Sequence, residues 1–378
     1  MDSNLKNTKI AIVHDYLNQY GGAERVLESL HGLFPEAPIY TLLHDPDMLP
    51  GHFRGWDIRP SFLNRLPGHR RHYQKLLALF PLAVESFDLN DYDIVISSSN
   101  AWAKGAITTS RTFHLCYVHT PMRFVWDWYH YISHEHNAVT NLFLIPFLSR
   151  IRLWDECSCQ RPDFYVSNSM EVQRRIAKYY RRHSTVVYPP VKTDFFIPPE
   201  DSAIGDYFLV VSRLKPHKRI DLAVKAFNQL KLKLIIVGDG GEYNRLKCLA
   251  GPNINFAGRV SDDQLLKYYQ GCRALIFPAL EDFGIAPVEA QACGRPVIAY
   301  GKGGSEETIV DGRTGILFQQ QTPESLISAV TGFNQFQFES KTVRKQAETF
   351  DQKIFEQKFI RILSDQYKAF LQQRQGDR

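Results

Sequence analysis

The chain has 378 residues and a formal net charge of +5, with 44% apolar and 22% charged residues. The composition is that of an ordinary globular protein, and one hydrophobic core rarely grows beyond about 250–300 residues, so we expect two domains. The mild positive charge suits an anionic ligand or a membrane surface, whereas no recognised module that binds nucleic acid accompanies it.

Cysteine usage and apolar length argue against two further classes of protein. Six cysteines are scattered along the chain and no secretory signal precedes them, so we expect reduced thiols and a cytoplasmic location. Cys157 and Cys159 form a C-x-C pair without a second pair at zinc spacing, which favours structural cysteines. The longest apolar run, residues 142–148, contains Pro146 and is far shorter than the ~18 residues of a membrane-spanning helix.

The first buried strand is predicted over residues 9–13, followed by a turn over 14–22 and a helix over 23–34. The turn ends in Gly21 and Gly22. Paired glycines between a strand and a helix either let the backbone approach a phosphate or relieve a steric conflict. Both interpretations stay open, because the G-x-G-x-x-G pattern of dinucleotide sites is incomplete.

Further strands are predicted over residues 93–97 and 113–118, which indicates repeated β–α units around a parallel sheet. His119 follows the second of these strands, at the edge of the sheet where ligands gather. A lone histidine is more often a structural hydrogen-bonding group than a catalyst. Arg123 is either a contact for an acidic acceptor or a solvated side chain.

Residues 52–80 place six basic side chains among aromatic and apolar ones, with Asp57 as the single acid. This pattern suits a peripheral helix on anionic lipid, or equally an amphipathic helix that packs its leucines on the sheet and exposes its arginines. Nucleic acid is a poorer third interpretation. The basic residues are Arg54, Arg59, Arg65, Arg70, Arg71 and Lys75.

The second half of the chain begins after Pro189 and Pro190, which we interpret as a stiff connector between domains. We therefore predict domains over residues 1–188 and 189–349, followed by a segment, 350–378, that is largely one amphipathic helix. A strand over 207–212 delivers Arg213, and Lys218 stands five residues later, before a helix over 219–230. Two such cations offset the charge of a diphosphate, although basic loop residues are usually only solvated.

Residues 277–296 contain the most informative stretch: a strand end, a turn with acids, and a short helix that we expect to begin at Pro287. Backbone N–H groups just before a helix form a site for an anion such as phosphate. Glu289, inside the helix, is suited to accept the hydroxyls of a ribose, and Glu281 faces whatever the phosphate carries. Alternatively, both acids are ordinary residues of a loop and a first helical turn.

In combination these features resemble the retaining GT-B glycosyltransferases of glycosyltransferase family 4, also called group 1. The matches are the R-x4-K spacing of Arg213 and Lys218 and the two-glutamate spacing of Glu281 and Glu289. The resemblance covers nearly the whole chain. It implies an α/β fold of the GT-B type, with two doubly wound Rossmann-like domains, a cleft between them, and a last helix that crosses back to the first domain.

The resemblance also implies roles for single residues. In this family the donor diphosphate is bound at the positions of Gly21, Gly22, Arg213, Lys218, Phe283, Gly284 and Ile285. The nucleoside lies near Gly238, Val260 and Glu289, and His119 and Glu281 hold the transferred sugar. Because His217-Lys218-Arg219 replaces the commoner lysine-glycine, the sequence departs from the family beside a matched position.

The implied reaction transfers a hexose from a nucleotide diphosphate sugar to an acceptor hydroxyl with retention of configuration. The leaving phosphate takes the acceptor's proton, and a covalent intermediate on Glu281 is the minority alternative. We expect no metal and no cofactor beyond the donor. The local sequence is similar to bacterial mannosyltransferases of polysaccharide assembly, so the expected donor is GDP-mannose, with a UDP-sugar second.

The expected acceptor is a glycan linked to polyprenyl diphosphate, at the inner face of the plasma membrane, where residues 52–80 would make a peripheral contact. Two rivals from other classes remain. A nucleotide-sugar 2-epimerase shares the architecture but differs in the motif around Arg213 and Lys218. A non-catalytic module would bind a sugar nucleotide without turnover.

Overall fold

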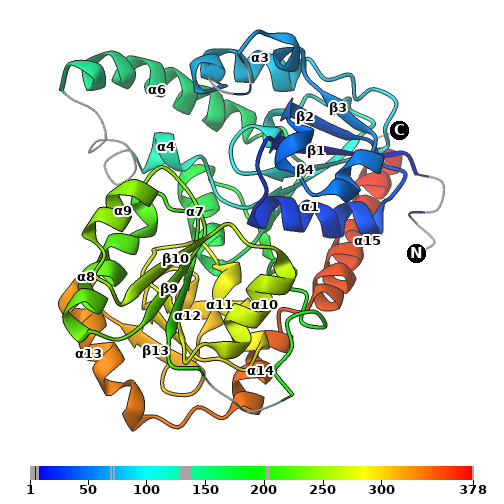
Figure 1. Cartoon of the computed structure of the whole chain (residues 1–378). Helices are drawn as coiled ribbons and strands as arrows, with labels where there is room; N and C mark the ends of the chain where they lie inside the picture. Colours follow the sequence, from blue (N-terminus) through cyan, green and yellow to red (C-terminus); the bar gives the residue numbers. More distant parts are fainter. Residues whose placement is uncertain are drawn as a thin grey trace. The chain divides into compact units, whose positions relative to one another are not determined.

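A computed structural model describes residues 5, 8–68, 70, 73–127, 138–200 and 205–376, with the backbone alone for residues 138–144 and 376. The chain divides into two compact units. Unit 1 consists of residues 1–188 together with 355–378, and unit 2 consists of residues 189–354. The two are coloured along the sequence in Figure 1.

The described part of unit 1 contains a seven-stranded parallel sheet with the strand order β3-β2-β1-β4-β5-β6-β7. The order reverses between β1 and β4, and this reversal creates the crevice in which doubly wound sheets bind ligands. The strands are β1 Ile10–Leu17, β2 Ile39–His44, β3 Ile58–Pro60, β4 Ile94–Ser99, β5 Phe113–Val118, β6 Phe164–Ser167 and β7 Thr185–Val186.

Helices cover both faces of this sheet, because successive side chains of its strands point to opposite faces. In β1, Ile10 and Ile12 pack beneath α1 and α15, whereas Ala11 and Val13 pack with α3 and α6 (Figure 1). The helices are α1 Gly22–Leu33, α3 Phe80–Glu85, α4 Arg123–Trp126, α6 Ala138–Ser158, α7 Met170–Tyr179 and α15 Gln352–Gly376, with short 3₁₀ turns η2 Pro46–Met48, η3 Gly51–Gly55, η4 Phe62–Arg65, η5 Tyr73–Leu79 and η6 Ala103–Gly105.

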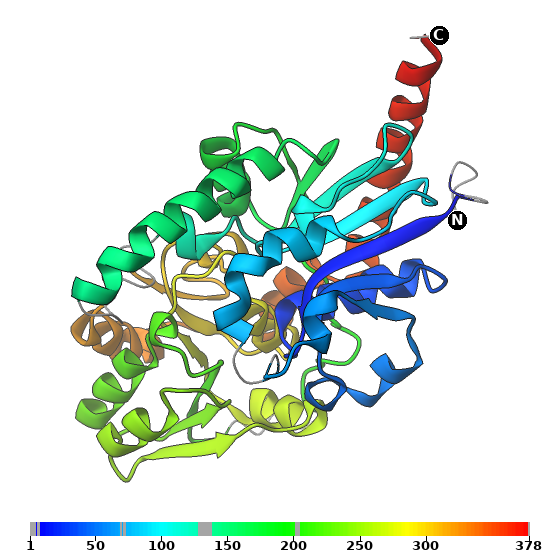
Figure 2. The ribbon, with the colours of Figure 1, turned by 90° about the horizontal axis from the view of Figure 1, so that it is seen from above.

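The last helix belongs to the core of unit 1 along most of its length. Phe355, Phe359 and Leu363 are buried against the first sheet, and Tyr367 lies 6.1 Å from the ring of Phe113. Figure 2 shows the red helix running beside the strands of this unit. These aromatic side chains are packing residues, as the amphipathic pattern of this segment indicates.

The described part of unit 2 contains a six-stranded parallel sheet with the order β10-β9-β8-β11-β12-β13, which reverses between β8 and β11. The strands are β8 Phe208–Val211, β9 Leu234–Val237, β10 Ile254–Gly258, β11 Leu275–Phe277, β12 Val297–Tyr300 and β13 Gly315–Phe318. The prediction of an α/β class with two doubly wound parallel sheets is therefore confirmed.

Two of the described helices of unit 2 begin after a residue whose side chain caps them, Ser261 in one case and Thr322 in the other. Ser261 and Gln264 form a reciprocal capping box at the start of α10, as expected for a serine before an acidic first turn. The helices are α8 Ile220–Leu230, α9 Tyr243–Leu249, α10 Asp262–Gly271, α11 Ile285–Ala292, α12 Ser305–Thr308, α13 Pro323–Gly332 and α14 Ser340–Glu348, with 3₁₀ turns η7 Pro216–Lys218 and η8 Phe333–Gln335.

Two predicted boundaries are wrong. We expected β1 to end at residue 13, but it continues to Leu17, because His14 and Asp15 are buried and find polar partners inside the unit. The helix expected to begin at Pro287 begins at Ile285. Proline is tolerated within the first turn because the N–H that it lacks has no acceptor there.

The prediction of one amphipathic helix over residues 52–80 is also wrong. The described residues form three 3₁₀ turns and the short strand β3, because Gly55, Pro60, Pro67 and Gly68 interrupt any helical pattern. The basic side chains described here are exposed, and Leu63 is fully buried. Arg71 lies outside the described residues. Within the described part of the chain, no helix has the length and apolar character needed to cross a bilayer.

Candidate functional site

The edge of the second sheet brings Lys218 and Glu281 together at the point where the strand order reverses. Lys218 ends the turn after β8, Glu281 lies in the turn after β11, and their side chains form an ion pair. Both side chains are mostly buried, with exposed fractions of 15% and 17%. Arg213 leaves the same strand end as an exposed side chain. Two cations and a carboxylate thus lie at the carboxyl ends of two neighbouring strands, β8 and β11.

The first turn of α11 lies in the same turn-and-helix segment as Glu281. Gly284 precedes it with φ 88°, a left-handed conformation that favours glycine, and Ile285 is the first helical residue. N–H groups in a first turn have no acceptor within the helix, so they and the helix dipole favour an anion there. Phe283 is buried and packs edge-on against Phe350, and this contact holds the turn before α11 in place.

A glycine pair that we did not assign to the site supports this turn. Gly304 donates its N–H to the carbonyl oxygen of Glu281 at 2.9 Å, and a Cβ on Gly304 would lie 2.3 Å from the Cα of Phe283. A Cβ on Gly303 would lie 2.5 Å from the Glu281 carbonyl oxygen. The loop after β12 therefore packs directly on the acidic turn, and only glycine permits that approach. The Gly-Gly dipeptide after a strand was the available sequence signal.

The predicted nucleoside residues occupy the same edge of the sheet. Glu289 lies on α11, is 4% exposed, and accepts a 2.8 Å hydrogen bond from the hydroxyl of Tyr269. Val260 follows β10 and is partly buried. Gly238 has φ 129°, and a Cβ there would lie 1.9 Å from the carbonyl oxygen of Ser212. Close packing of two strand ends is thus sufficient reason for this glycine.

Arg219 takes the left-handed conformation that a glycine would otherwise supply, with φ 53°. Its guanidinium donates to Gln321 at 3.3 Å, and the Gln321 amide donates to the carbonyl oxygen of Pro278 at 2.8 Å. Asp221 accepts a further bond at 3.3 Å. The side chain therefore links the turn that bears Lys218 to the strand end that leads to Glu281.

Unit 1 has its own polar cluster at the carboxyl ends of β1, β4 and β5. Ser98 lies between two histidines, 3.0 Å from Nδ1 of His14 and 2.8 Å from Nε2 of His119. Glu24, on α1, places its carboxylate 3.6 Å from Nε2 of His14. Each of these four side chains is buried. Sequence reasoning identified His119 alone; the polar His-Asp and Ser-Ser-Ser ends of otherwise apolar strands were the missed signal.

Burial lowers the pKa of His119 from its ordinary value of 6.5 to about 3. The imidazole is therefore neutral near pH 7. A neutral ring offers one donor and one acceptor, which suits hydrogen bonding to a hydroxyl better than neutralising a phosphate.

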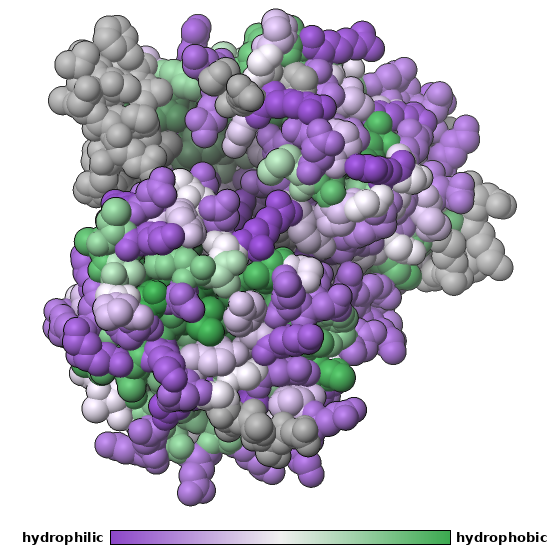
Figure 3. All heavy atoms as spheres, in the orientation of Figure 1, coloured by the Kyte–Doolittle hydropathy of each residue, from purple (hydrophilic) through white to green (hydrophobic). Residues whose placement is uncertain are grey.

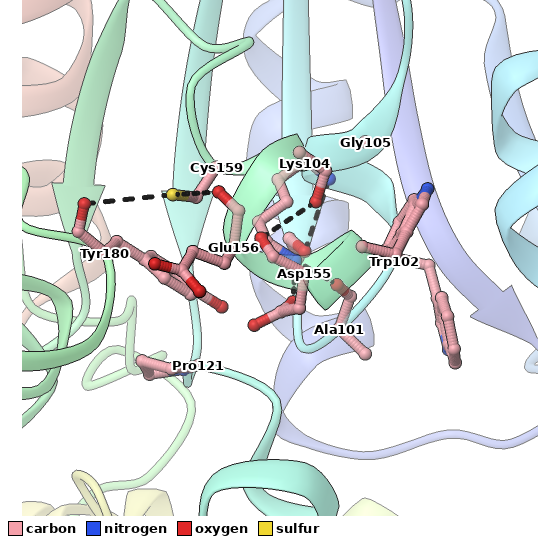
Figure 4. A network of polar contacts seen from close by, with 12 residues as sticks. Ala101, Trp102, Lys104, Gly105, Pro121, Asp155, Glu156, Cys159 and Tyr180 are labelled. Carbon is pink, nitrogen blue, oxygen red and sulfur yellow. Dashed lines mark hydrogen bonds and ion pairs between the residues drawn. The ribbon is translucent and has the colours of Figure 1, made fainter. Parts of the chain in front are cut away.

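Two buried charged side chains, those of Asp15 and Lys104, hold the loop after β4 in place. The carboxylate of Asp15 accepts four backbone N–H groups, from residues 100 to 103, at 2.6–2.9 Å. Lys104 donates to the Ala101 carbonyl oxygen at 2.5 Å and forms an ion pair with Asp155 of α6 (Figure 4). This loop follows Ser99, the residue after Ser98, so the anchors hold the polar cluster in place.

Gly21 and Gly22 lie at the start of α1, near this cluster. Gly21 is the N-cap in an extended conformation, and a Cβ there would lie 3.4 Å from a carboxylate oxygen of Glu24, an ordinary contact. Sterics at this position therefore do not require glycine, so the phosphate interpretation stays a prediction. Among the described residues, no group of three or more His, Cys, Asp or Glu side chains has the arrangement of a metal site.

Comparison with known proteins finds a family model that matches part of the chain. Residues 199–349 match the model for glycosyl transferases group 1, and we call these residues the group 1 segment. Lys218, Glu281 and Glu289 all lie inside the group 1 segment, whereas the cluster around His119 lies outside it.

Three curated relatives illustrate the similarity. Alpha-1,3/1,6-mannosyltransferase ALG2 of Dictyostelium discoideum is 27% identical, over 82% of this chain and 86% of its own. The uncharacterized glycosyltransferase MJ1178 of Methanocaldococcus jannaschii is 25% identical, and the chain spans 57% of its length. A GDP-mannose-dependent alpha-(1-6)-phosphatidylinositol monomannoside mannosyltransferase of Mycolicibacterium smegmatis is 27% identical, over 44% of this chain and 53% of its own.

Among solved structures, sucrose-phosphate synthase (tll1590) from Thermosynechococcus elongatus matches with a TM-score of 0.77 and 18% identity, over 96% of this chain and 100% of that chain. At this identity the likeness establishes the fold alone. The predicted GT-B fold class is confirmed.

Proposed function

We propose that the protein is a retaining glycosyltransferase that moves mannose from GDP-mannose to a glycan or lipid-linked glycan acceptor. The observation that carries the proposal is the pairing of Lys218 with Glu281 beside the first turn of α11, inside the group 1 segment. GDP-mannose is favoured over a UDP-sugar because two relatives are named as mannosyltransferases, one of them GDP-mannose-dependent.

In this proposal the donor diphosphate binds at Arg213, Lys218 and the first turn of α11. The diphosphate replaces Glu281 as the partner of Lys218, which releases the carboxylate to bind the sugar. As the bond from the sugar to phosphate breaks, charge grows on the leaving diphosphate, and fixed cations and N–H groups stabilise it most in the transition state.

The remaining residues hold the other parts of the reactants. Glu289 binds the ribose, with Tyr269 orienting its carboxylate, and Gly238 and Val260 border the nucleoside. The proposal assigns His119 to the donor sugar and Gly21 and Gly22 to the diphosphate, as the family resemblance implies. The leaving phosphate accepts the acceptor's proton, so no protein base is needed.

A donor panel tests this proposal. GDP-mannose, GDP, UDP-glucose and UDP are each titrated while stability and release of nucleoside diphosphate are followed. A ligand at 100 times its Kd adds about 2.7 kcal/mol to the free energy of unfolding. We expect GDP-mannose to stabilise the protein and to release GDP slowly. Stabilisation by the UDP-sugar alone would transfer the same chemistry to that donor.

Two outcomes would contradict the transferase itself. Conversion of the sugar nucleotide to its 2-epimer without an acceptor would identify an epimerase. Tight binding without any turnover, unchanged by Glu281→Gln or His119→Ala, would identify a binding module. With an acceptor present, NMR of the product's anomeric centre distinguishes retention from inversion.

We further propose that unit 1 contacts anionic lipid through α3 and α6 together with the exposed basic residues of 52–80. Leu82 of α3 and Leu153 of α6 are 58% and 64% exposed, and the Trp154 indole bonds to Glu85 at 2.8 Å, which holds the two helices together. Figure 3 shows hydrophilic and hydrophobic side chains side by side at the top of unit 1, around α3. Basic and apolar side chains on one surface suit a charged bilayer.

Vesicle flotation tests the lipid contact. We expect binding to vesicles that contain phosphatidylglycerol and little binding to pure phosphatidylcholine. Leu82→Asp with Leu153→Asp removes the binding, whereas Ile107→Asp, at another exposed position of unit 1, retains it. Equal binding by the double variant, or no binding to anionic vesicles at all, would remove this proposal.

A further inference from the structure

A buried chain of polar side chains runs from α1 to the end of β5. It starts at the carboxylate of Glu24, passes through the ring of His14 and the hydroxyl of Ser98, and ends at Nε2 of His119. The exposed fractions are 2%, 1%, 0% and 7% in that order. Because water reaches these groups poorly, their hydrogen positions are set by one another.

The hydroxyl of Ser98 decides how the hydrogens are shared. It carries one hydrogen, so it donates to at most one of the two histidine nitrogens. Its distances to the two rings, 3.0 Å and 2.8 Å, are both those of hydrogen bonds. The tautomers of His14 and His119 are therefore linked in one direction: if Ser98 donates to His14, Nε2 of His119 must carry a hydrogen and donate to Ser98.

Glu24 sets the direction of this chain. A carboxylate 3.6 Å from Nε2 of His14 repels a bare lone pair at that nitrogen and attracts an N–H. No hydrogen bond from the described residues reaches this nitrogen, so the carboxylate decides where the single N–H of a neutral His14 ring lies, and it lies at Nε2. Nδ1 of His14 is then an acceptor and takes the hydrogen of Ser98. The Ser98 oxygen in turn accepts from Nε2–H of His119.

We propose that Glu24, His14 and Ser98 act as positioning residues that hold His119 as the Nε2–H tautomer and leave its Nδ1 as a hydrogen-bond acceptor. Among the described residues, the ring of His119 hydrogen-bonds only to Ser98. On the proposed function, on which this assignment rests, the partner of Nδ1 is a hydroxyl of the transferred sugar. His119 then accepts from that hydroxyl and does not donate to it.

The same strand offers a matched control. Ser97, the neighbour of Ser98 in β4, points to the opposite face and bonds at 2.8 Å to Nε2 of His114, which is fully buried. Ser97 and His114 thus form the same kind of serine–histidine contact as Ser98 and His119, but neither a glutamate nor a second histidine is part of it.

Histidine-selective nitrogen-15 NMR of the whole protein tests the tautomer directly, without a substrate. Signals are assigned by loss in His119→Gln and His14→Gln. We expect pyrrole-type Nε2 and pyridine-type Nδ1 in both rings, and loss of the single tautomer at His119 in Ser98→Ala but not in Ser97→Ala. A pyrrole-type Nδ1 at His119, or an imidazolium at His14, would overturn the proposal.

Steady-state kinetics tests the consequence for transfer. Ser98→Ala is expected to lower kcat about tenfold, the effect of one lost hydrogen bond of ordinary strength, while the KM for the donor changes less. Ser98→Thr, which keeps the hydroxyl, restores kcat, and Ser97→Ala leaves it unchanged. Equal losses in all three variants would indicate a merely structural role. If no transfer is found at all, the proposed function fails. The NMR result still decides whether Glu24, His14 and Ser98 fix the tautomer of His119.

Discussion

Unit 1 contains two histidines that are buried and neutral. His119 belongs to the proposed site, and His114 does not. Burial lowers the pKa of both His114 and His119 from 6.5 to about 3. In the unfolded chain both rings bind a proton near pH 6.5. Between these pH values the unfolded state therefore carries more protons than the folded state, and the free energy of unfolding falls as the pH falls.

We expect unit 1 to lose about 1.4 kcal/mol of stability per pH unit for each of these histidines, approached as the pH drops below about 6. His114→Gln removes one of them and should lower that slope by the same amount. Urea unfolding at a series of pH values measures it. His183→Gln, at an exposed position, is the control, and an unchanged slope in His114→Gln would contradict the prediction.

The ion pair of Lys218 and Glu281 makes opposite predictions for its two members. Lys218→Met should weaken binding of free nucleoside diphosphate about 10- to 100-fold, because a charge-assisted hydrogen bond is lost. Glu281→Gln should strengthen it severalfold, because the competing carboxylate becomes neutral. Isothermal titration with GDP measures both. Lys215→Met, an exposed lysine in the same loop, serves as control, and equal weakening by Lys218→Met and Lys215→Met would argue against a specific contact.

Arg219 shows what residue patterns do not reveal about a site. The sequence identifies it as a departure from a lysine-glycine pair, but not that it takes the left-handed conformation itself. Nor does spacing predict the bridge through Gln321, which lies 102 residues away. Motifs record the residues that meet a ligand, whereas the residues that hold those motifs in place come from distant loops and carry no local signal.

A buried ion pair holds the loop after β4 against α6. Lys104 and Asp155 are 1% and 0% exposed, and breaking such a pair from one side leaves an uncompensated charge. Lys104→Met should therefore lower the stability of unit 1 by about 3–5 kcal/mol. Lys104→Met combined with Asp155→Leu should recover part of that loss, because no charge remains although the Trp126 indole loses its acceptor. Chemical denaturation of the three proteins measures this, and an equal or larger loss in the double variant would contradict it.

Buried parallel strands were predictable from sequence because their apolar runs are short and bounded by turn residues. The ends of the strands were less predictable. β1 continues through His14 and Asp15 because their polar partners lie on β4 and in the loop after it. Residues 52–80 were misread for a related reason. The alternation of basic and apolar side chains fits a helix, but Pro60 and Pro67 with two glycines break the backbone into short turns.

The candidate site was predictable only where it follows a motif. Lys218 and Glu281, predicted separately, are brought together by the reversal of strand order in the second sheet. The cluster of Glu24, His14 and Ser98 was not predicted, because two strands and a helix assemble it and each residue alone is ordinary. The roles of all these residues toward a ligand stay predictions.

At the scale of the whole molecule, α15 completes the core of unit 1. Phe359 is fully buried and stacks on Phe355 with the ring centroids 5.7 Å apart. Phe359→Ala should destabilise unit 1 by about 3–5 kcal/mol, the range for large aromatic truncations in a core. Hydrogen exchange resolves the two units. We expect faster exchange in the strands of unit 1 and unchanged exchange in unit 2, and Phe336→Ala, at an exposed position of unit 2, should leave both unaltered.

Because α15 belongs to unit 1, that unit consists of two stretches of chain separated by all of unit 2. On the ribosome, residues 1–188 emerge first, yet the aromatic face around Phe113 and Tyr117 stays uncovered until Phe355 and the residues after it have been made. Residues 189–354 are complete by then and have every element of their own core. We therefore expect the second unit to complete its fold first during synthesis and the first unit to close last, in contrast to the usual N-terminal-first order.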